Sequence, residues 1–125
     1  PDFIEVKGYM FVGASRQRLS LKNMPFHEDV VAFTDDLAKY LPGYEVVTDH
    51  APSRVVMLAK KEFRKDGKWY TWIDFKKFKE LALKGDDFGA MDYVARTPRA
   101  SFAKDNVPDK ENPELEDDVV KVGGL

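Results

Sequence analysis

Cysteine is absent from the 125-residue sequence, and histidine is nearly so. Without cysteine the chain can form no disulfide, no thiolate zinc site and no cysteine-held iron–sulfur cluster, and a cytoplasmic setting is favoured. The two histidines, His27 and His50, come without a third ligand, so no metal site is predicted. No apolar run approaches the roughly 20 residues that cross a bilayer, and we expect no membrane partner.

What is present indicates a folded α/β protein whose charge is unevenly spread. Hydrophobic residues make up 43% of the chain and aromatic residues 13%, which is enough for one modest core. Residues 1–84 carry fifteen Lys and Arg against twelve Asp and Glu (+3), whereas residues 85–125 carry five against ten (−5). A mildly basic body is compatible with a nucleic-acid partner, although a dedicated binding domain is usually far more basic.

The first predicted element is a strand over residues 3–13 that is apolar on both faces apart from Glu5 and Lys7. Such a strand is usually covered on both sides, as in a parallel sheet flanked by helices. Glu5 and Lys7 share one face because side chains alternate along a strand. The chain begins in what reads as the middle of this strand, so we expect it to be a piece of a longer polypeptide.

A basic connector and a helix are predicted next. Arg16, Arg18 and Lys22 lie between Gly13 and Pro25. The helix covers residues 25–41, because acidic residues occupy its first turn and apolar residues recur at spacings of three and four. The apolar positions are Val30, Phe33, Leu37 and Leu41.

Beyond this helix the pattern predicts short strands and a second helix. Residues 44–50 and 54–63 read as a β-hairpin, and an Asp66-Gly67 turn leads into an aromatic strand over residues 68–75. The second helix starts after an Asp74 N-cap and stops at Gly85. Its inward residues are expected to be Phe75, Phe78 and Leu81. The last twenty or so residues are expected to be disordered or to lie on a partner surface.

Asp2, Glu5 and Lys7 occur in the order of the ligands of a metal-dependent nuclease. Along one strand, however, Asp2 and Glu5 would lie about 10 Å apart on opposite faces, which disfavours a shared cation. Lys7 instead invites two interpretations. Its amine can be held near neutrality by burial and form a Schiff base with a carbonyl, with Glu5 moving protons. Alternatively, the two residues form an ion pair at a strand end.

Two further groups of residues can contact nucleic acid. Arg16, Arg18 and Lys22 can hold phosphates, although a solvated loop explains them equally well. Trp69, Tyr70 and Trp72 can stack on bases, although a hairpin core explains most of that strand more simply. One aromatic ring would then remain for recognition.

Several stretches together resemble a known enzyme family. These are "FIEVKGYMFVGASRQRL", "NMPFHEDVVAF", "YEVVTDHAPSRVVMLA", "KKEFRKDGKWYTWIDFKKFKEL" and "MDYVARTPRASF". They resemble, in order, the C-terminal third of the radical S-adenosylmethionine enzymes of wybutosine synthesis, the tRNA 4-demethylwyosine synthases. The resemblance covers residues 2–103.

The resemblance implies a fold and a division of the chain. Residues 1–13 would be a late strand of an incomplete (β/α) radical-SAM barrel, with Glu5 and Lys7 toward its interior or mouth. Residues 14–85 would form a small α+β wyosine base formation domain, and residues 86–125 an extended segment with an acidic tail.

The resemblance also implies a reaction. The family condenses N1-methylguanosine, next to the anticodon of tRNA-Phe, with two carbons of pyruvate to give 4-demethylwyosine, a carbon–carbon lyase reaction. It uses S-adenosylmethionine and a 4Fe-4S cluster that a Cys-x-x-x-Cys-x-x-Cys loop holds. That loop is absent here. The chain alone is therefore expected to be inactive and to work with a missing N-terminal radical SAM part.

The expected site residues follow. Lys7 and Glu5 would be catalytic, whereas Arg16, Arg18, Lys22 and Asn23 would bind tRNA, and no residue would bind a metal. The alternative is a free-standing RNA-binding module without catalysis.

Overall fold

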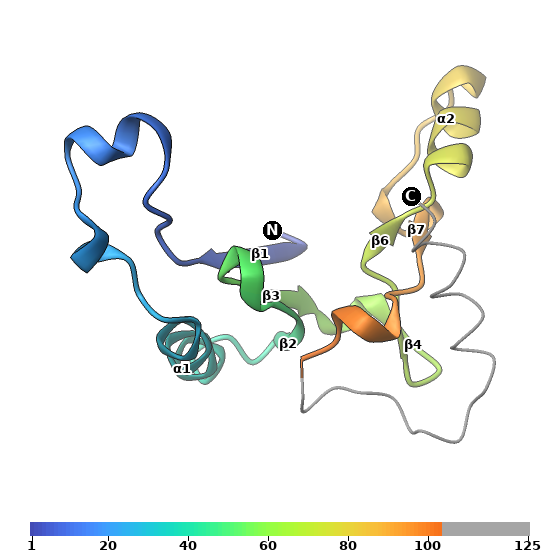
Figure 1. Cartoon of the computed structure of the whole chain (residues 1–125). Helices are drawn as coiled ribbons and strands as arrows, with labels where there is room; N and C mark the ends of the chain where they lie inside the picture. The colour runs from blue at the N-terminus through green and yellow to red at the C-terminus, as the bar shows by residue number, and fades with distance from the viewer. Residues whose placement is uncertain (104–125) are drawn as a thin grey trace. The chain divides into compact units, whose positions relative to one another are not determined.

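A computed structural model describes residues 1–103, and in this range the chain has mixed α/β structure with three small sheets and two α-helices (Figure 1). The described residues form two compact units. Unit 1 contains residues 1–60 and the segment that starts at Ser101, and unit 2 contains residues 61–100. Within the described range, neither helix has the length and apolar character needed to cross a membrane. The predicted disordered tail lies outside the described residues.

The sheet of unit 1 has three antiparallel strands. These are β1 (Phe3–Lys7), β2 (Tyr44–His50) and β3 (Val55–Lys60), in the order β1-β3-β2. The predicted hairpin of residues 44–63 is confirmed as the β2–β3 pair. Val47 forms a bulge in β2, because Val46 pairs with Leu58 and Thr48 already pairs with Met57.

β1 differs from the predicted strand in length and in pairing. It ends at Lys7 instead of Gly13, and its only described neighbour, β3, is antiparallel to it. The Gly8 amide still donates to the Arg54 carbonyl at 2.7 Å, but the Val12 amide then bonds the Met10 carbonyl at 2.9 Å. The apolar run therefore leaves the sheet after Gly8 and makes a turn of its own. The barrel around β1 stays a prediction.

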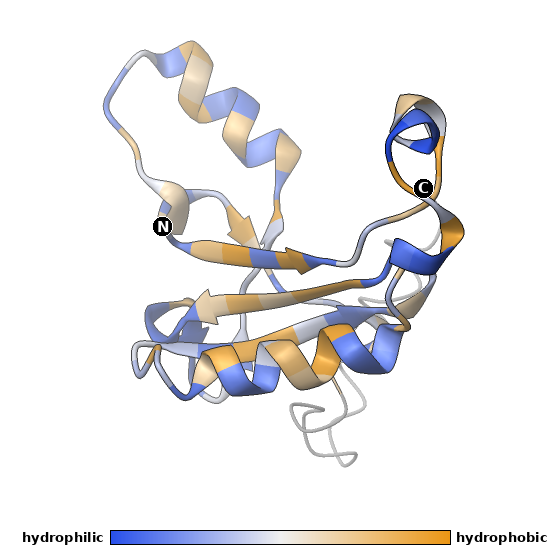
Figure 2. Ribbon diagram, turned by 90° about the vertical axis from the view of Figure 1, so that its left-hand side faces the viewer, coloured by the Kyte–Doolittle hydropathy of each residue, from blue (hydrophilic) through white to orange (hydrophobic). Residues whose placement is uncertain are grey.

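The connector between β1 and the first helix contains two short 3-10 helices, η1 (Gly13–Gln17) and η2 (Leu21–Asn23). The predicted helix follows as α1 (His27–Ala38). An Asp29 carboxylate oxygen accepts a hydrogen bond from the Phe26 amide at 3.0 Å, which helps to fix the start of the helix. Figure 2 shows hydrophobic and hydrophilic residues alternating along α1, as expected for a helix that lies on a sheet.

The core of unit 1 lies between α1 and the sheet. Val30 and Thr34 are the buried residues of α1, and Val47, Val56, Leu58 and Ala59 are the most buried apolar residues of the strands. The Thr34 hydroxyl donates to the Val30 carbonyl at 2.7 Å, so its burial leaves no unpaired hydroxyl.

The predicted inward position of Phe33 on α1 is wrong. This side chain is 60% exposed. Val30 and Thr34 face the sheet and so define how α1 is rotated about its axis. Residue 33 lies about 100° around the axis from residue 34, and its side chain therefore points away from the core.

The chain returns to unit 1 after residue 100. Phe102 pairs with Thr48 of β2 in an antiparallel bridge, and the Ala103 amide donates to the Val47 carbonyl at 2.9 Å. Phe102 is also buried. This segment therefore covers part of the outer edge of β2.

Unit 2 starts with a small hairpin. η4 (Lys61–Phe63) leads into β4 (Arg64–Lys65), which pairs with β5 (Lys68–Trp69). The predicted Asp66-Gly67 turn joins them, and both turn residues have positive φ, 52° and 74°. This is the backbone of a type I′ turn, which matches the twist of a two-residue hairpin.

The single aromatic strand predicted over residues 68–75 is wrong. It is two strands, β5 and β6 (Trp72–Ile73), and β6 pairs with β7 (Val94–Ala95) instead of β4. At the break, the Thr71 amide and hydroxyl bond the Thr97 hydroxyl at 3.0 and 2.7 Å. These bonds replace strand pairing, so the chain can change partner there.

α2 (Phe75–Lys84) has the predicted ends. The Asp74 carboxylate accepts a hydrogen bond from the Lys77 amide at 2.9 Å, and Gly85 ends the helix with φ 80°. Phe78 packs edge-to-face on Tyr93 and Phe88, with ring centroids 5.1 and 5.7 Å away.

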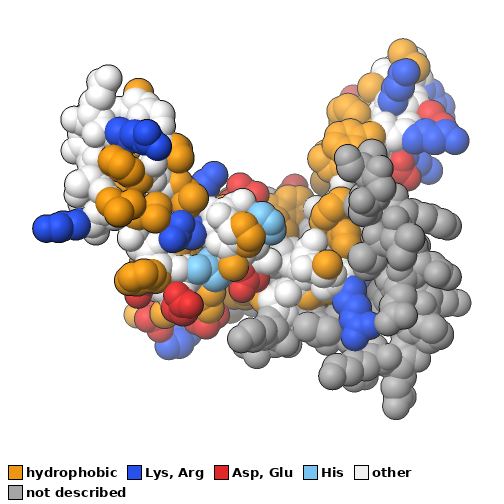
Figure 3. Space-filling model, in the orientation of Figure 1, with side chains coloured by type: hydrophobic (Ala, Val, Ile, Leu, Met, Phe, Trp, Pro, Cys, Tyr) orange, Lys and Arg blue, Asp and Glu red, His pale blue; other side chains and the backbone are white. Residues whose placement is uncertain are grey.

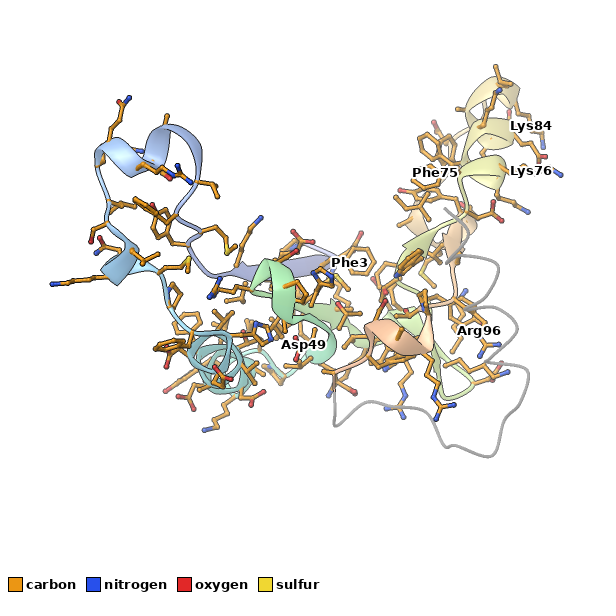
Figure 4. All side chains as sticks on the ribbon, viewed as in Figure 1. Phe3, Asp49, Phe75, Lys76, Lys84 and Arg96 are labelled. Carbon is orange, nitrogen blue, oxygen red and sulfur yellow. The ribbon has the colours of Figure 1, made fainter. Side chains whose placement is uncertain are left out.

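The predicted inward position of Phe75 is wrong, since 73% of its surface is exposed. η5 (Ala90–Asp92) and η6 (Arg99–Ser101) complete the described elements. Figure 4 shows Phe75 and the lysines Lys76 and Lys84 on opposite sides of α2.

Candidate functional site

A pocket of about 380 Å³ lies in unit 1 where β1, the connector and α1 meet. It contains two of the residues predicted from the sequence, Lys7 and Asn23. Its other lining residues are Val6, Gly8, Tyr9, Pro25, Asp29, Val30 and Phe33. The pocket therefore combines one amine, one amide and one carboxylate with a mainly apolar and aromatic wall.

Gly8 brings the wall of this pocket together. A Cβ atom at this position would lie 2.8 Å from Val30 Cγ2, 3.0 Å from Pro25 Cγ and 3.2 Å from Arg54 Cβ. Only a residue without a side chain lets the end of β1 approach the helix and its preceding proline this closely. Lys7 thus projects from a backbone that is held directly against α1.

Lys7 and Glu5 share a face of β1, but only Lys7 lines the pocket. Both side chains are exposed, and the structure records no ion pair between them in residues 1–103. The ion pair offered as the simpler interpretation is therefore not formed. The exposure also means that unit 1 alone does not supply the dry surroundings that a neutral lysine needs.

The side-chain oxygen of Asn23 and one carboxylate oxygen of Asp29 already accept hydrogen bonds from nearby residues. The Asn23 side-chain oxygen accepts from the Ser20 amide at 2.9 Å and from its hydroxyl at 3.1 Å. These bonds fix the amide, so the Asn23 NH₂ group is left to donate. One Asp29 oxygen accepts from the Phe26 amide, which leaves the other as an acceptor. The pocket can therefore offer a ligand donors and one anionic acceptor.

The chemistry that this pocket allows is limited and specific. The Lys7 amine and the Asn23 amide can donate to a carbonyl or carboxylate oxygen, while Tyr9 and Phe33 provide aromatic surface for a planar group. An amine beside a carbonyl can also add to it, provided that water is excluded when the ligand is bound. The sequence did not single out Gly8, Tyr9 or Phe33 as site residues, although all three lie in stretches that carry the family resemblance.

The predicted phosphate-binding residues of the connector are all exposed, and apart from Asn23 they do not line the pocket. Arg16 is held by its own segment: Nε donates to the Phe11 carbonyl at 3.3 Å, and the guanidinium lies 5.2 Å from the centre of the Phe11 ring. The side chains of Arg18 and Lys22 make no hydrogen bond or ion pair with another described residue. Figure 3 shows Lys and Arg side chains among hydrophobic and uncharged ones over the connector between β1 and α1, at the left of the view.

Asp2 and the two histidines, which the sequence disfavours as metal ligands, have other partners in the structure. Asp2 is 3.4 Å from Lys60 Nζ, His27 bonds Asp49, and His50 bonds Ser53. In residues 1–103 no three His, Cys, Asp or Glu side chains are placed to hold a metal ion together. Of the two tryptophans, Trp69 is buried and Trp72 is 38% exposed, as the hairpin-core interpretation predicts.

The chain is similar in sequence to a known protein family and to several curated proteins. Residues 1–60, which contain the whole pocket, match the family model described as wyosine base formation. The S-adenosyl-L-methionine-dependent tRNA 4-demethylwyosine synthase TYW1 of Danio rerio is 44% identical over 105 residues, which is 78% of this chain and 14% of that protein. The synthase of Arabidopsis thaliana is 46% identical over 101 residues, 78% of this chain and 16% of that protein.

The chain therefore belongs to the tRNA 4-demethylwyosine synthase family, as a portion that includes its wyosine base formation region. The TYW1 protein of Homo sapiens is similar to the same extent, with 41% identity over 105 residues. The chain spans only 14–16% of the length of these curated relatives.

Proposed function

We propose that this chain is part of a cytoplasmic radical S-adenosylmethionine enzyme of wybutosine biosynthesis. The complete enzyme converts N1-methylguanosine, next to the anticodon of tRNA-Phe, to 4-demethylwyosine with two carbons of pyruvate, a carbon–carbon lyase reaction. Two observations support this proposal: the names of the relatives, and a pocket with a lysine amine that lies wholly within the wyosine base formation match.

The cofactors belong to the rest of that enzyme. A 4Fe-4S cluster needs cysteine thiolates, and this chain has no cysteine. The donor set therefore does not fit the cluster, and we assign no step through the cluster or S-adenosylmethionine to this chain. The chain by itself is proposed to be inactive and to work with an N-terminal radical SAM part.

The proposed division of the chain follows the family resemblance. Residues 1–13 complete the edge of a (β/α) barrel, residues 14–85 form the wyosine base formation domain and residues 86–125 form an extended segment. In this arrangement the barrel covers the open side of the pocket beside Lys7. Such a cover would supply the desolvation that unit 1 lacks.

The proposed role of Lys7 is to bind the keto group of pyruvate. The neutral amine adds to the ketone carbon, the carbinolamine loses water, and a protonated imine results. Glu5, on the same face of β1, would accept the proton that the amine loses and return it to the former ketone oxygen, and a second proton from solvent lets this oxygen leave as water while the imine stays protonated. Arg16, Arg18, Lys22 and Asn23 would contact the tRNA, with the three cations facing phosphates.

Lys7→Arg in the complete enzyme tests the role of Lys7. Arginine keeps the charge but forms no Schiff base, so 4-demethylwyosine formation, measured by mass spectrometry of digested tRNA, should be almost lost while tRNA binding is retained. Borohydride should trap labelled pyruvate on the parent enzyme but not on this variant. Lys39→Arg, at the exposed residue that follows the end of α1, is the matched control and should leave product formation unchanged. Substantial turnover by the Lys7 variant would return this residue to a charge-binding role.

A further inference from the structure

A second and larger groove of unit 1 follows the opposite side of α1. It has a volume of about 820 Å³, and its walls are α1, β2 and Ala103. The lining residues of α1 begin at His27 and end at Ala38, so the groove follows the whole helix, about 18 Å. It shares no lining residue with the Lys7 pocket.

The floor of this groove is apolar and its shape is fixed at one end. Val31, Val46 and Val56 lie along it with several alanines, so its apolar side chains are small apart from that of Tyr44. At the end near the start of α1, His27 Nε2 is 2.5 Å from Asp49 Oδ1. This bond joins the first turn of the helix to the end of β2. Figure 4 shows Asp49 beside α1.

The charge of the groove has one sign. Glu28, Asp35, Glu45 and Asp49 line it, and among residues 1–103 no Lys or Arg does. Glu28 is in the first turn of α1, where the helix dipole favours an acidic residue. Asp35 is near the other end, where the same dipole disfavours one, so the helix alone does not account for it.

Asp36, the neighbour of Asp35, shows how such a charge is normally balanced. Its carboxylate is 2.7 Å from Lys39 Nζ, and this hydrogen bond raises the pKa of the amine. The Asp35 side chain makes no hydrogen bond or ion pair with another described residue, and it lines the groove. Its charge also helps to raise the pKa of Lys39, but this amine bonds Asp36, so the Asp35 carboxylate can still accept a cation that enters the groove.

We infer that this groove binds a basic polypeptide segment of a partner, in extended form, with Lys or Arg side chains on either side of small apolar ones. Glu28 and Asp35 are seven residues apart, about 10 Å along the helix. Side chains on one face of an extended peptide are about 7 Å apart at a spacing of two residues and about 13 Å apart at a spacing of four, so two long cationic side chains on that face can reach both carboxylates. The carboxylates would repel the phosphates of RNA. Residues 104–125 of this chain have seven acidic residues against three lysines, so like charge also disfavours them as the occupant. The inference is independent of the proposed function.

A labelled peptide, Arg-Ala-Val-Ala-Arg-Ala-Val-Ala-Arg, which places its arginines and valines on one face when extended, provides the test with the 125-residue chain. Fluorescence anisotropy should give a dissociation constant below about 1 mM that increases with salt. In ¹⁵N spectra the peptide should shift the amide signals of α1 and β2. The same peptide with glutamate in place of arginine should not bind. Failure of the arginine peptide to bind, or shifts confined to other elements, would overturn the inference.

Variants of α1 separate the groove from general charge effects. Asp35→Asn should weaken peptide binding about two- to fivefold, the range of an exposed ion pair. Asp36→Asn removes the same charge one residue away, outside the groove, and should leave binding unchanged. Ala32→Phe should block the floor and reduce binding more than tenfold, while dispersed ¹⁵N spectra confirm that it folds. Equal effects of Asp35→Asn and Asp36→Asn would show that the peptide responds only to the net charge of the protein. This result would refute binding in the groove.

Discussion

Gly8→Ala should destabilise unit 1 by about 1–2 kcal/mol, although glycine-to-alanine changes often stabilise proteins. The alanine Cβ would be 2.8 Å from Val30 Cγ2 and 3.0 Å from Pro25 Cγ, closer than such contacts allow. Neither neighbour can move easily. Val30 is a buried, β-branched helix residue with one preferred rotamer, and Pro25 is a rigid ring.

The magnitude follows from two opposing effects. Overpacking of a tight contact costs about 1–3 kcal/mol, whereas the loss of glycine freedom in the unfolded chain returns about 0.4–1 kcal/mol. The contact term is the larger. Gly43→Ala is the matched control in the same unit, because its Cβ meets nothing within 4 Å and its φ is not positive. It should be neutral or slightly stabilising.

Urea unfolding followed by circular dichroism at 222 nm measures both changes. Fluorescence is unsuitable for this comparison, since Trp69 and Trp72 both lie in unit 2. The Gly8 variant should lower the unfolding midpoint with an unchanged slope. If Gly8→Ala were as stable as Gly43→Ala, α1 could move away from β1 without cost, and the tight closure of the Lys7 pocket would be refuted.

Two other variants test the RNA contact and the second helix. Replacing Arg16 and Arg18 together by Gln in the complete enzyme should weaken tRNA binding and reduce the slope of log affinity against log salt by about 1.5–2, because two phosphate contacts are lost. An unchanged slope in filter-binding titrations would place tRNA elsewhere. Asp74→Ala should destabilise α2 by about 1 kcal/mol in tryptophan-monitored unfolding, since the cap of the Lys77 amide is lost. Asp87→Ala, outside the helix, is its control, and equal losses from both would disprove the capping role.

Local chemistry explains which elements could be predicted from the sequence. The Asp66-Gly67 turn, the Asp74 cap and the Gly85 stop each depend on neighbours within a few residues, and all three are found. The single aromatic strand fails because Thr71 meets Thr97, 26 residues later, and nothing near Thr71 in the sequence indicates that contact.

The candidate site shows the same limit. Lys7 and Asn23 stand out in the sequence by residue type and by family resemblance, but their common pocket depends on Gly8 touching a helix that starts some twenty residues later. The groove along α1 was not predicted either. Its only sequence signal is Asp35, an acidic residue near the C-terminal end of α1, where the helix dipole disfavours negative charge. The other wall of the groove is β2, which lies beyond α1 in the sequence.

The return of Phe102 to β2 makes unit 2 an insertion in the chain of unit 1. The chain leaves the sheet at Lys60, which pairs with Tyr44, and rejoins it at Phe102, beside Thr48. Tyr44 and Thr48 are four residues apart along β2, and Lys60 and Phe102 lie on opposite sides of this strand, two strand spacings apart. Lys60 and Phe102 are therefore about 15 Å apart. A linker of about five extended residues could span that distance. Residues 61–100 can thus vary in length, or be exchanged as a cassette, without breaking the strand order of the sheet that carries Lys7.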